Sequence, residues 1–197
     1  VVKATGASAT CLNLSETQND SNRAKTRKAG LGNKITTVHG VFEDIPEPDS
    51  SYDVVWSQDA LLHSDNRGQA LAEVWRVLKP GGVFVFTDPM QADDVDPATL
   101  KPVYDRLGLA SLGSFKYYRE ATTALGFETV RQDDMTGDLR SHYARVREEL
   151  IANRAMLKEN GVSDAYMDKM TEGLKNWVEA ADAGRLAWGI QVFRKPA

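Results

Sequence analysis

The segment Val54–Ser64 (VVWSQDALLHS) places several polar side chains directly after a short apolar run. Its first residues, VVW, are typical of a buried strand, whereas the tripeptide SQD that follows carries a hydroxyl, an amide and a carboxylate. Together these groups supply the acceptors that an amine or another cation requires. We therefore take Ser57, Gln58 and Asp59 as candidate site residues. His63 is a further candidate, with a hydrogen-bonded loop histidine as the equal alternative.

Three other predicted strands end in the same manner. They are followed by Asn13, by Gly40-Val41-Phe42 and by Asp88-Pro89-Met90. In an open parallel sheet, ligands bind beyond the carboxyl ends of the strands, so these loops should meet at one edge. We predict a crevice there with a polar group for a ribose, an apolar wall for a purine and acceptors for an amine. For any single loop, the alternative is a polar turn that faces water.

The elements that must position these loops alternate along the chain. Apolar runs predict strands at 8–14, 35–38, 52–56, 83–86, 126–131 and 186–194, and helical spacing predicts helices at 15–28, 67–79, 138–159 and 164–182. Pro80-Gly81-Gly82 is expected to end helix 67–79 sharply. The alternation up to Pro89 predicts an α/β, doubly wound sheet, and the helices at 138–182 form an insertion before the last strand.

The composition excludes several classes of protein. A net charge of -4 argues against a nucleic-acid binder, which needs a basic face. No apolar run is long enough to span a membrane, and VVKATGAS is neither a signal nor a transit peptide. The single Cys11 excludes an intrachain disulfide and fits a cytoplasmic protein. His63 and His142 are far apart and lack carboxylate partners at ligand spacing, so we expect no metal.

Two stretches carry a resemblance to a known family. EVWRVLKPGGVFVFTDP resembles the helix, turn and strand of class I S-adenosylmethionine-dependent methyltransferases, and GVFEDIPEPDSSYDVVWSQDALLHS is similar to the stretch that precedes them. Five separated motifs together resemble the sarcosine/dimethylglycine methyltransferases, which make glycine betaine: CLNLSETQN, WSQDALLHS, FTDPM, SHYARVREEL and GRLAWGIQVFRK. The resemblance covers essentially the whole chain. It implies a Rossmann-like, three-layer αβα fold whose mostly parallel sheet has an antiparallel last strand.

One departure from the family pattern concerns the N-terminus. The family's first strand and glycine-rich cofactor loop have no counterpart here, and VVKATGAS resembles the end of the helix that follows that loop. We therefore expect an N-terminally truncated fold with reduced cofactor affinity. We expect one domain, 1–197, with 1–90 as the cofactor-binding half of the sheet and 91–197 as the substrate-side half.

The resemblance implies roles for individual residues. The implied contacts with S-adenosylmethionine are Asn13, Leu14, Val41, Phe42, Ser57, Gln58, Asp59 and His63. Asn13 faces the ribose or forms a turn, and Phe42 packs on the purine or in the core. The substrate side is expected to comprise Asp88, Pro89, Met90, Tyr118, Arg119, His142 and Tyr143. Asp59 and Asp88 would stabilise developing positive charge. Trp188 is expected in the core, with the wall of the ammonium pocket as the alternative.

The implied reaction is methyl transfer from S-adenosylmethionine to the nitrogen of dimethylglycine, and of sarcosine, in osmoprotectant synthesis by a monomer. One alternative is a class I methyltransferase for another small amine, phenol or lipid precursor. A second is a nucleotide-binding oxidoreductase domain, which is disfavoured because Gly81-Gly82 precedes a strand instead of opening a helix. A third is an inactive, non-catalytic fragment.

Overall fold

The computed structural model describes residues 1–197, which form eight α-helices, two 3₁₀ helices and six strands. The strands are β1 (Ala9–Asn13), β2 (Ile35–His39), β3 (Tyr52–Gln58), β4 (Leu78–Gln91), β5 (Glu128–Asp134) and β6 (Leu186–Arg194). The helices are α1 (Val2–Thr5), α2 (Glu16–Lys28), η1 (Leu61–His63), α3 (Arg67–Val77), η2 (Pro97–Leu100), α4 (Lys101–Leu107), α5 (Phe115–Ala124), α6 (Thr136–Ala152), α7 (Arg154–Glu159) and α8 (Asp164–Asp182).

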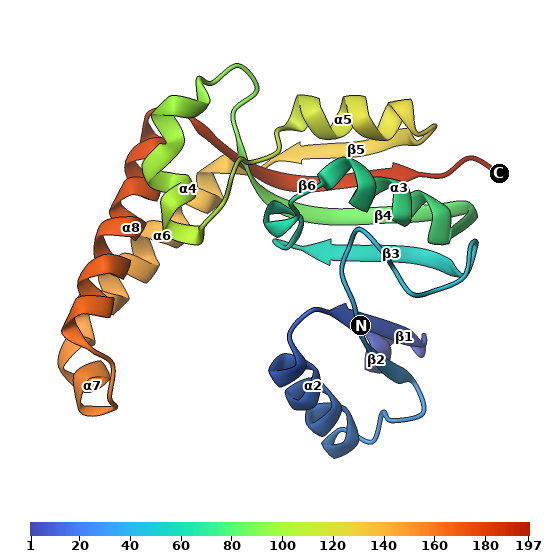
Figure 1. Ribbon diagram of the computed structural model, residues 1–197, viewed down its shortest axis with the longest axis horizontal. Coiled ribbons are helices and arrows are strands. Elements are labelled where there is room, and N and C mark those ends of the chain that lie inside the picture. The colour runs from blue at the N-terminus through green and yellow to red at the C-terminus, as the bar shows by residue number, and fades with distance from the viewer.

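The strands form two sheets. β3, β4, β6 and β5 make a four-stranded sheet in that order, in which β3 pairs parallel to β4 and β6 pairs antiparallel to both of its neighbours. β1 and β2 pair in parallel and form a second sheet that is not hydrogen-bonded to β3 (Figure 1). The predicted antiparallel last strand is therefore present, with its predicted bounds of 186 and 194.

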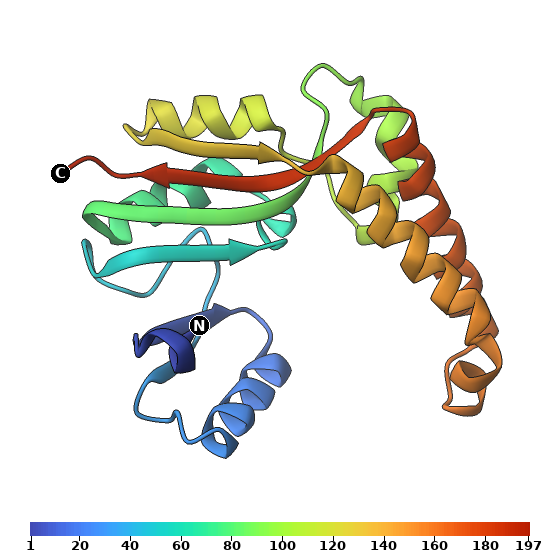
Figure 2. The ribbon, with the colours of Figure 1, turned by 180° about the vertical axis from the view of Figure 1, so that it is seen from behind.

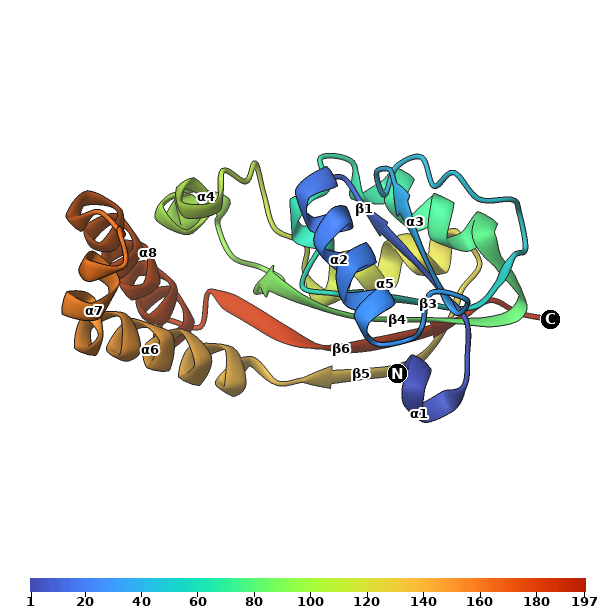
Figure 3. The same cartoon turned by 90° about the horizontal axis from the view of Figure 1, so that it is seen from below.

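Helices α3 and α5 cover one face of the four-stranded sheet, as Figure 3 shows. Phe84, Phe86 and Phe193 are buried on that face, because alternate residues of a strand point to the same side. Val83 and Val85, on the opposite face, remain partly exposed.

The predicted helical insertion forms an arm. α6 and α8 run side by side away from the sheet, and α7 lies at the far end of the arm (Figures 1 and 2). The sequence predicts one helix over 138–159, whereas the structure divides it at Asn153 into α6 and α7. A second hydrophobic cluster, around Leu139 and the fully buried Trp177, joins the arm to α4 and to the start of β6.

Local signals explain several boundaries. Ser15 caps α2 by accepting a hydrogen bond from the Gln18 amide, as its position before the helix predicts. The turn Pro80-Gly81-Gly82 behaves differently from the prediction. α3 already ends at Val77, and the turn lies within the span of β4, where Gly81 has a φ of 78° that favours glycine.

Candidate active site

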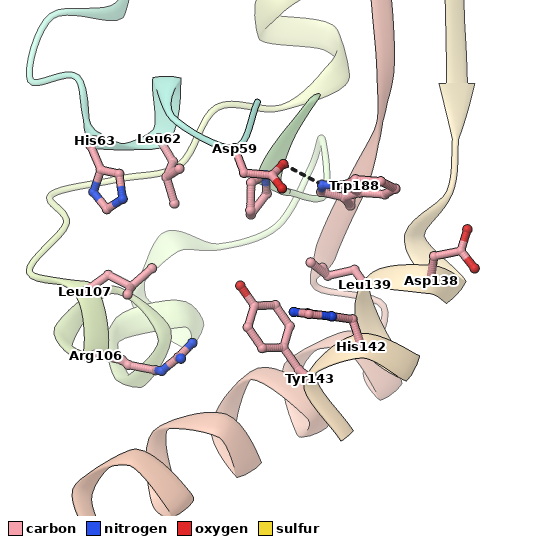
Figure 4. A pocket seen from close by; sticks show the side chains of 11 residues that line it. Asp59, Leu62, His63, Arg106, Leu107, Asp138, Leu139, His142, Tyr143 and Trp188 are labelled. Carbon is pink, nitrogen blue, oxygen red and sulfur yellow. Dashed lines mark hydrogen bonds between the residues drawn. The ribbon is translucent and has the colours of Figure 1, made fainter. Parts of the chain in front are cut away.

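A pocket of about 380 Å³ lies where the carboxyl ends of β3 and β4 face α4 and α6 (Figure 4). Eleven residues line it: Asp59, Leu62, His63, Pro89, Arg106, Leu107, Asp138, Leu139, His142, Tyr143 and Trp188. Its volume suits a small ligand. Of the residues predicted for the site, the pocket brings together Asp59, His63, Pro89, His142 and Tyr143.

Asp59 is held in an unusual conformation directly after β3. Its φ of 49° places a non-glycine residue in the left-handed region, which costs free energy and is most frequent at functional sites. The Asp59 amide donates to the Thr87 carbonyl oxygen at 2.8 Å. Its Oδ1 accepts from Thr87 Oγ1 at 2.9 Å and from Trp188 Nε1 at 2.8 Å. The neighbouring strands β4 and β6 therefore fix one carboxylate oxygen and leave Oδ2 without a protein donor.

Trp188 combines the two placements that the sequence left open. Its half-buried ring packs against the second hydrophobic cluster and also lines the pocket beside Asp59, where the indole N–H donates to the Asp59 carboxylate (Figure 4). A run of alternating residues in a strand predicts which side chains share a face. It does not predict whether that face meets the core or a ligand.

Asp88 corrects an expectation from the sequence, because it lies beneath the pocket and not in it. The residue is fully buried, its Oδ1 accepts from the Leu62 amide at 3.0 Å, and its Oδ2 accepts from the Tyr118 hydroxyl at 2.6 Å. Burial raises the pKa of Asp88 to about 7, although both hydrogen bonds and the charge of Arg67 oppose the rise. Asp88 therefore positions η1, which carries Leu62 and His63, and lies outside the lining of the pocket.

Three further residues predicted to contact substrate lie elsewhere. Tyr118 is fully buried against Asp88, and desolvation holds the pKa of its phenol well above the usual range. Met90 is also fully buried, with its Sδ accepting from the side-chain Nε2 of Gln191. Arg119 is exposed on α5 and donates to Gln132. Tyr118 and Arg119 are adjacent on α5, and only the first of them faces the core.

The residues predicted to contact the cofactor lie outside this pocket, apart from Asp59 and His63. Asn13 ends β1 and uses both sides of its amide locally, accepting from the Ser15 amide and donating to Gln18. Leu14 is 64% exposed and Val41 37% exposed, so both have apolar surface available to a ligand. Phe42 is half-buried and packs against the main core cluster.

The end of β3 adds a polar group with no partner. Ser57 and Gln58 are its last two residues, next to Asp59. The Ser57 hydroxyl is buried and makes no hydrogen bond within the chain. A buried hydroxyl without a partner costs free energy, so it is suited to a polar ligand group.

Sequence reasoning missed Arg106, the cation of the pocket. It lies in the last turn of α4, and its guanidinium packs 5.3 Å from the ring centre of Tyr143 and 5.7 Å from that of Trp177. The sequence did contain a signal for Arg106. Val103, Arg106 and Leu107 follow helical spacing, so the charged side chain lies next to the apolar face of a helix.

Neither the histidines nor the acidic residues form a metal-binding group. His63 and His142 line the same pocket although they are distant in sequence, yet no three His, Cys, Asp or Glu side chains are arranged to hold an ion.

None of the helices combines the length and apolar character needed to cross a lipid bilayer.

Comparison of this chain with known proteins identifies the class of protein to which its fold belongs. Residues 1–86 match the model of a methyltransferase domain. A solved structure from Galdieria sulphuraria, described as a candidate sarcosine dimethylglycine methyltransferase, is 39% identical and superposes with a TM-score of 0.93 over 99% of this chain and 72% of its own. The fold and the pocket at the strand ends define a class I, S-adenosylmethionine-dependent methyltransferase.

Two curated relatives narrow this assignment. The sarcosine/dimethylglycine N-methyltransferase of Aphanothece halophytica is 47% identical over 94% of this chain and 67% of its own length. That of Halorhodospira halochloris is 43% identical over 96% of this chain and 68% of its own length. This chain belongs to the sarcosine/dimethylglycine N-methyltransferase family, and it spans about two thirds of the length of these relatives.

Proposed function

We propose that this protein methylates the amine nitrogen of dimethylglycine, and of sarcosine, and so forms glycine betaine from dimethylglycine. Family membership supports the reaction. The environment of Asp59 is the observation that supports an amine as the methyl acceptor. A carboxylate with one oxygen fixed by Trp188 and Thr87, and the other free beside the pocket, suits a ligand with a positively charged nitrogen.

When bound, S-adenosylmethionine would supply a methyl group from a sulfonium centre, and its thioether product would keep the electron pair of the broken carbon–sulfur bond. The residues of this chain fit such a cofactor in two groups. Asn13, Leu14, Val41 and Phe42 offer an amide and apolar surface for the adenosine. The unpartnered Ser57 hydroxyl and the adjacent Gln58 would hold the methionine end.

The protein's own contribution is alignment and charge stabilisation. The nitrogen of dimethylglycine becomes a quaternary ammonium, so positive charge that cannot be lost as a proton remains in the pocket. Asp59 stabilises that charge directly, and the rings of Trp188 and Tyr143 offer aromatic faces to the methyl-ammonium group. Burial raises the pKa of Tyr143, so its hydroxyl stays neutral. Holding acceptor and donor in line is the principal source of rate in such a reaction.

A panel of methyl acceptors tests this proposal. Calorimetry with S-adenosylhomocysteine first establishes that the protein binds the cofactor product. Transfer of radiolabelled methyl is then compared among dimethylglycine, sarcosine, dimethylaminoethanol, a phenol and a phospholipid precursor. We expect the highest kcat/KM with dimethylglycine and substantial transfer to sarcosine. Preference for any of the last three acceptors contradicts the proposal.

Asp59→Asn provides the matched variant for the same assay. The amide keeps an oxygen that can accept from Trp188 and Thr87, so the loop retains its hydrogen bonds and only the charge is lost. We expect kcat/KM for dimethylglycine to fall about 10- to 100-fold, which corresponds to about 1.4 to 2.8 kcal/mol of transition-state stabilisation. Unchanged kinetics would remove Asp59 from the site.

A further inference from the structure

We infer that Arg106 is the carboxylate anchor of this pocket and sets its specificity for amino acids over amino alcohols. The inference rests on the proposed function and names a residue for the part of the substrate that does not react. Dimethylglycine, sarcosine and glycine betaine each carry a carboxylate one carbon from the nitrogen. A pocket for such molecules needs a cation at one end and an anion at the other.

The first argument is that Arg106 is a cation without a protein partner. Its Nε and Nη1 are buried and make no hydrogen bond, and no Asp or Glu lies within ion-pair distance. Removing a guanidinium from water without a counter-ion is costly. The cost is explained if an anion enters the pocket that Arg106 lines.

The second argument is the way the fold holds this side chain. Two aromatic rings, Tyr143 and Trp177, flank the guanidinium, which favours a planar cation. A β-carbon at Gly173 of α8 would lie 2.7 Å from Arg106 Cδ and 3.0 Å from its Cγ. Gly173 is buried in the middle of a helix, where glycine is unfavourable by about 1 kcal/mol relative to alanine. Because Gly173 has no side chain, the aliphatic part of Arg106 can pack directly against the backbone of α8.

The third argument is the placement of opposite charges. Figure 4 shows Asp59 and Trp188 on one side of the pocket and Arg106 on the other, with Tyr143 projecting between them. A zwitterion can therefore bind with its nitrogen toward Asp59 and the strand ends and with its carboxylate toward Arg106. Arg106 offers two parallel N–H donors to the two carboxylate oxygens, a geometry that lysine cannot reproduce.

Direct binding of two matched ligands tests the inference without turnover. Glycine betaine and choline carry the same trimethylammonium group, but choline has a hydroxymethyl group in place of the carboxylate. By calorimetry, we expect the wild-type protein to bind glycine betaine more tightly than choline. Arg106→Met should weaken glycine betaine binding about 30-fold or more and leave choline binding unchanged or slightly tighter. Arg106→Lys should show an intermediate loss.

Two further variants separate anchoring from folding. Gly173→Ala should displace the Arg106 stem and weaken binding of glycine betaine but not of choline. Arg145→Met is the control on α6, because Arg145 is largely exposed and pairs only with Glu149, and it should change neither affinity. The melting temperature of Arg106→Met without ligand should change little, since the substitution removes a partly buried charge without an acidic partner and loses only its contacts with two aromatic rings.

The outcomes distinguish this inference from the proposed function. If folded Arg106→Met still prefers glycine betaine over choline as strongly as the wild type, Arg106 is not the anchor, whatever the acceptor panel gives. If Arg106→Met loses the preference but dimethylglycine is not methylated, the proposed function fails and the carboxylate site stands.

Discussion

Asp59 directly follows β3 and Asp88 lies near the end of the neighbouring strand β4, but the two side chains have opposite environments. Asp59 is exposed beside the pocket and has one free oxygen. Asp88 is fully buried, and each of its oxygens has a donor. Identical side chains at equivalent positions of two parallel strands thus have different environments, because the first lines the pocket and the second holds η1 in place.

The buried Asp88 predicts a specific dependence of stability on pH. Its pKa in the folded protein is about 7, above the 3.8 of an ordinary aspartate, so the native state binds more protons than the unfolded state between about pH 4 and 7. We expect the free energy of unfolding to fall as pH rises through this window, by up to about 4 kcal/mol, and to level off above it. Urea unfolding at several pH values measures this slope.

Asp88→Asn should remove most of that pH dependence, because an amide does not titrate. The exposed Asp94, which forms no hydrogen bond, provides the control, and Asp94→Asn should keep the wild-type slope. An Asp88→Asn protein with the wild-type slope would assign the pH dependence to other groups.

At the scale of elements, the site depends on how β6 fits between β4 and β5. Gly189 of β6 lies opposite Asp88 on one side and Asp134 on the other. A β-carbon there would lie 2.0 Å from the Asp133 carbonyl oxygen and 2.7 Å from Phe115 Cζ. Only glycine permits this close approach, and the residue directly before it in the chain is Trp188 of the pocket.

Gly189→Ala should therefore destabilise the protein by about 3 kcal/mol, through overpacking between two paired strands and α5. Equilibrium urea unfolding measures the loss. Gly137→Ala, in the first turn of α6 with no atom near the new methyl group, should be neutral or slightly stabilising. Equal stabilities of the two variants would contradict the close approach at Gly189.

At the scale of the whole molecule, burial is distributed unevenly. Among the first 60 residues only Asn19 and Thr26 are buried, and both are polar. Both hydrophobic clusters instead belong to the four-stranded sheet, its covering helices and the arm. The pocket lies against the second of these clusters, which contributes Leu62 of η1 and Leu139 of α6 to its lining.

This distribution predicts regional differences in hydrogen exchange. Backbone amides of β1 and β2 should exchange at least about tenfold faster than those of β4 and β6. The reason is that few buried apolar contacts oppose the local opening of the N-terminal unit, which consists of β1, α2 and β2. Exchange followed by mass spectrometry of peptic fragments tests this. Equal protection of the two sheets would show that the unit opens only with the whole molecule.

Local sequence patterns determined most of the elements of this protein. The N-cap Ser15, the apolar run 186–194 and the helical spacing of 164–182 each specified a boundary that the structure confirms. Strand ends also identified Asp59 as a pocket residue, because chain direction alone brings the carboxyl ends of parallel strands to one edge.

The tertiary structure alone decided which polar residues face the pocket. Asp88 and Met90 are buried near the carboxyl end of β4. Arg106 joins Asp59 only because the helical arm and α4 fold back over the strand ends. Whether a charge has a partner depends on what packs around it in three dimensions. The sequence contains Arg106 as one charge among many, and its burial against Tyr143 and Trp177 without an acidic neighbour makes it the candidate anchor for a carboxylate.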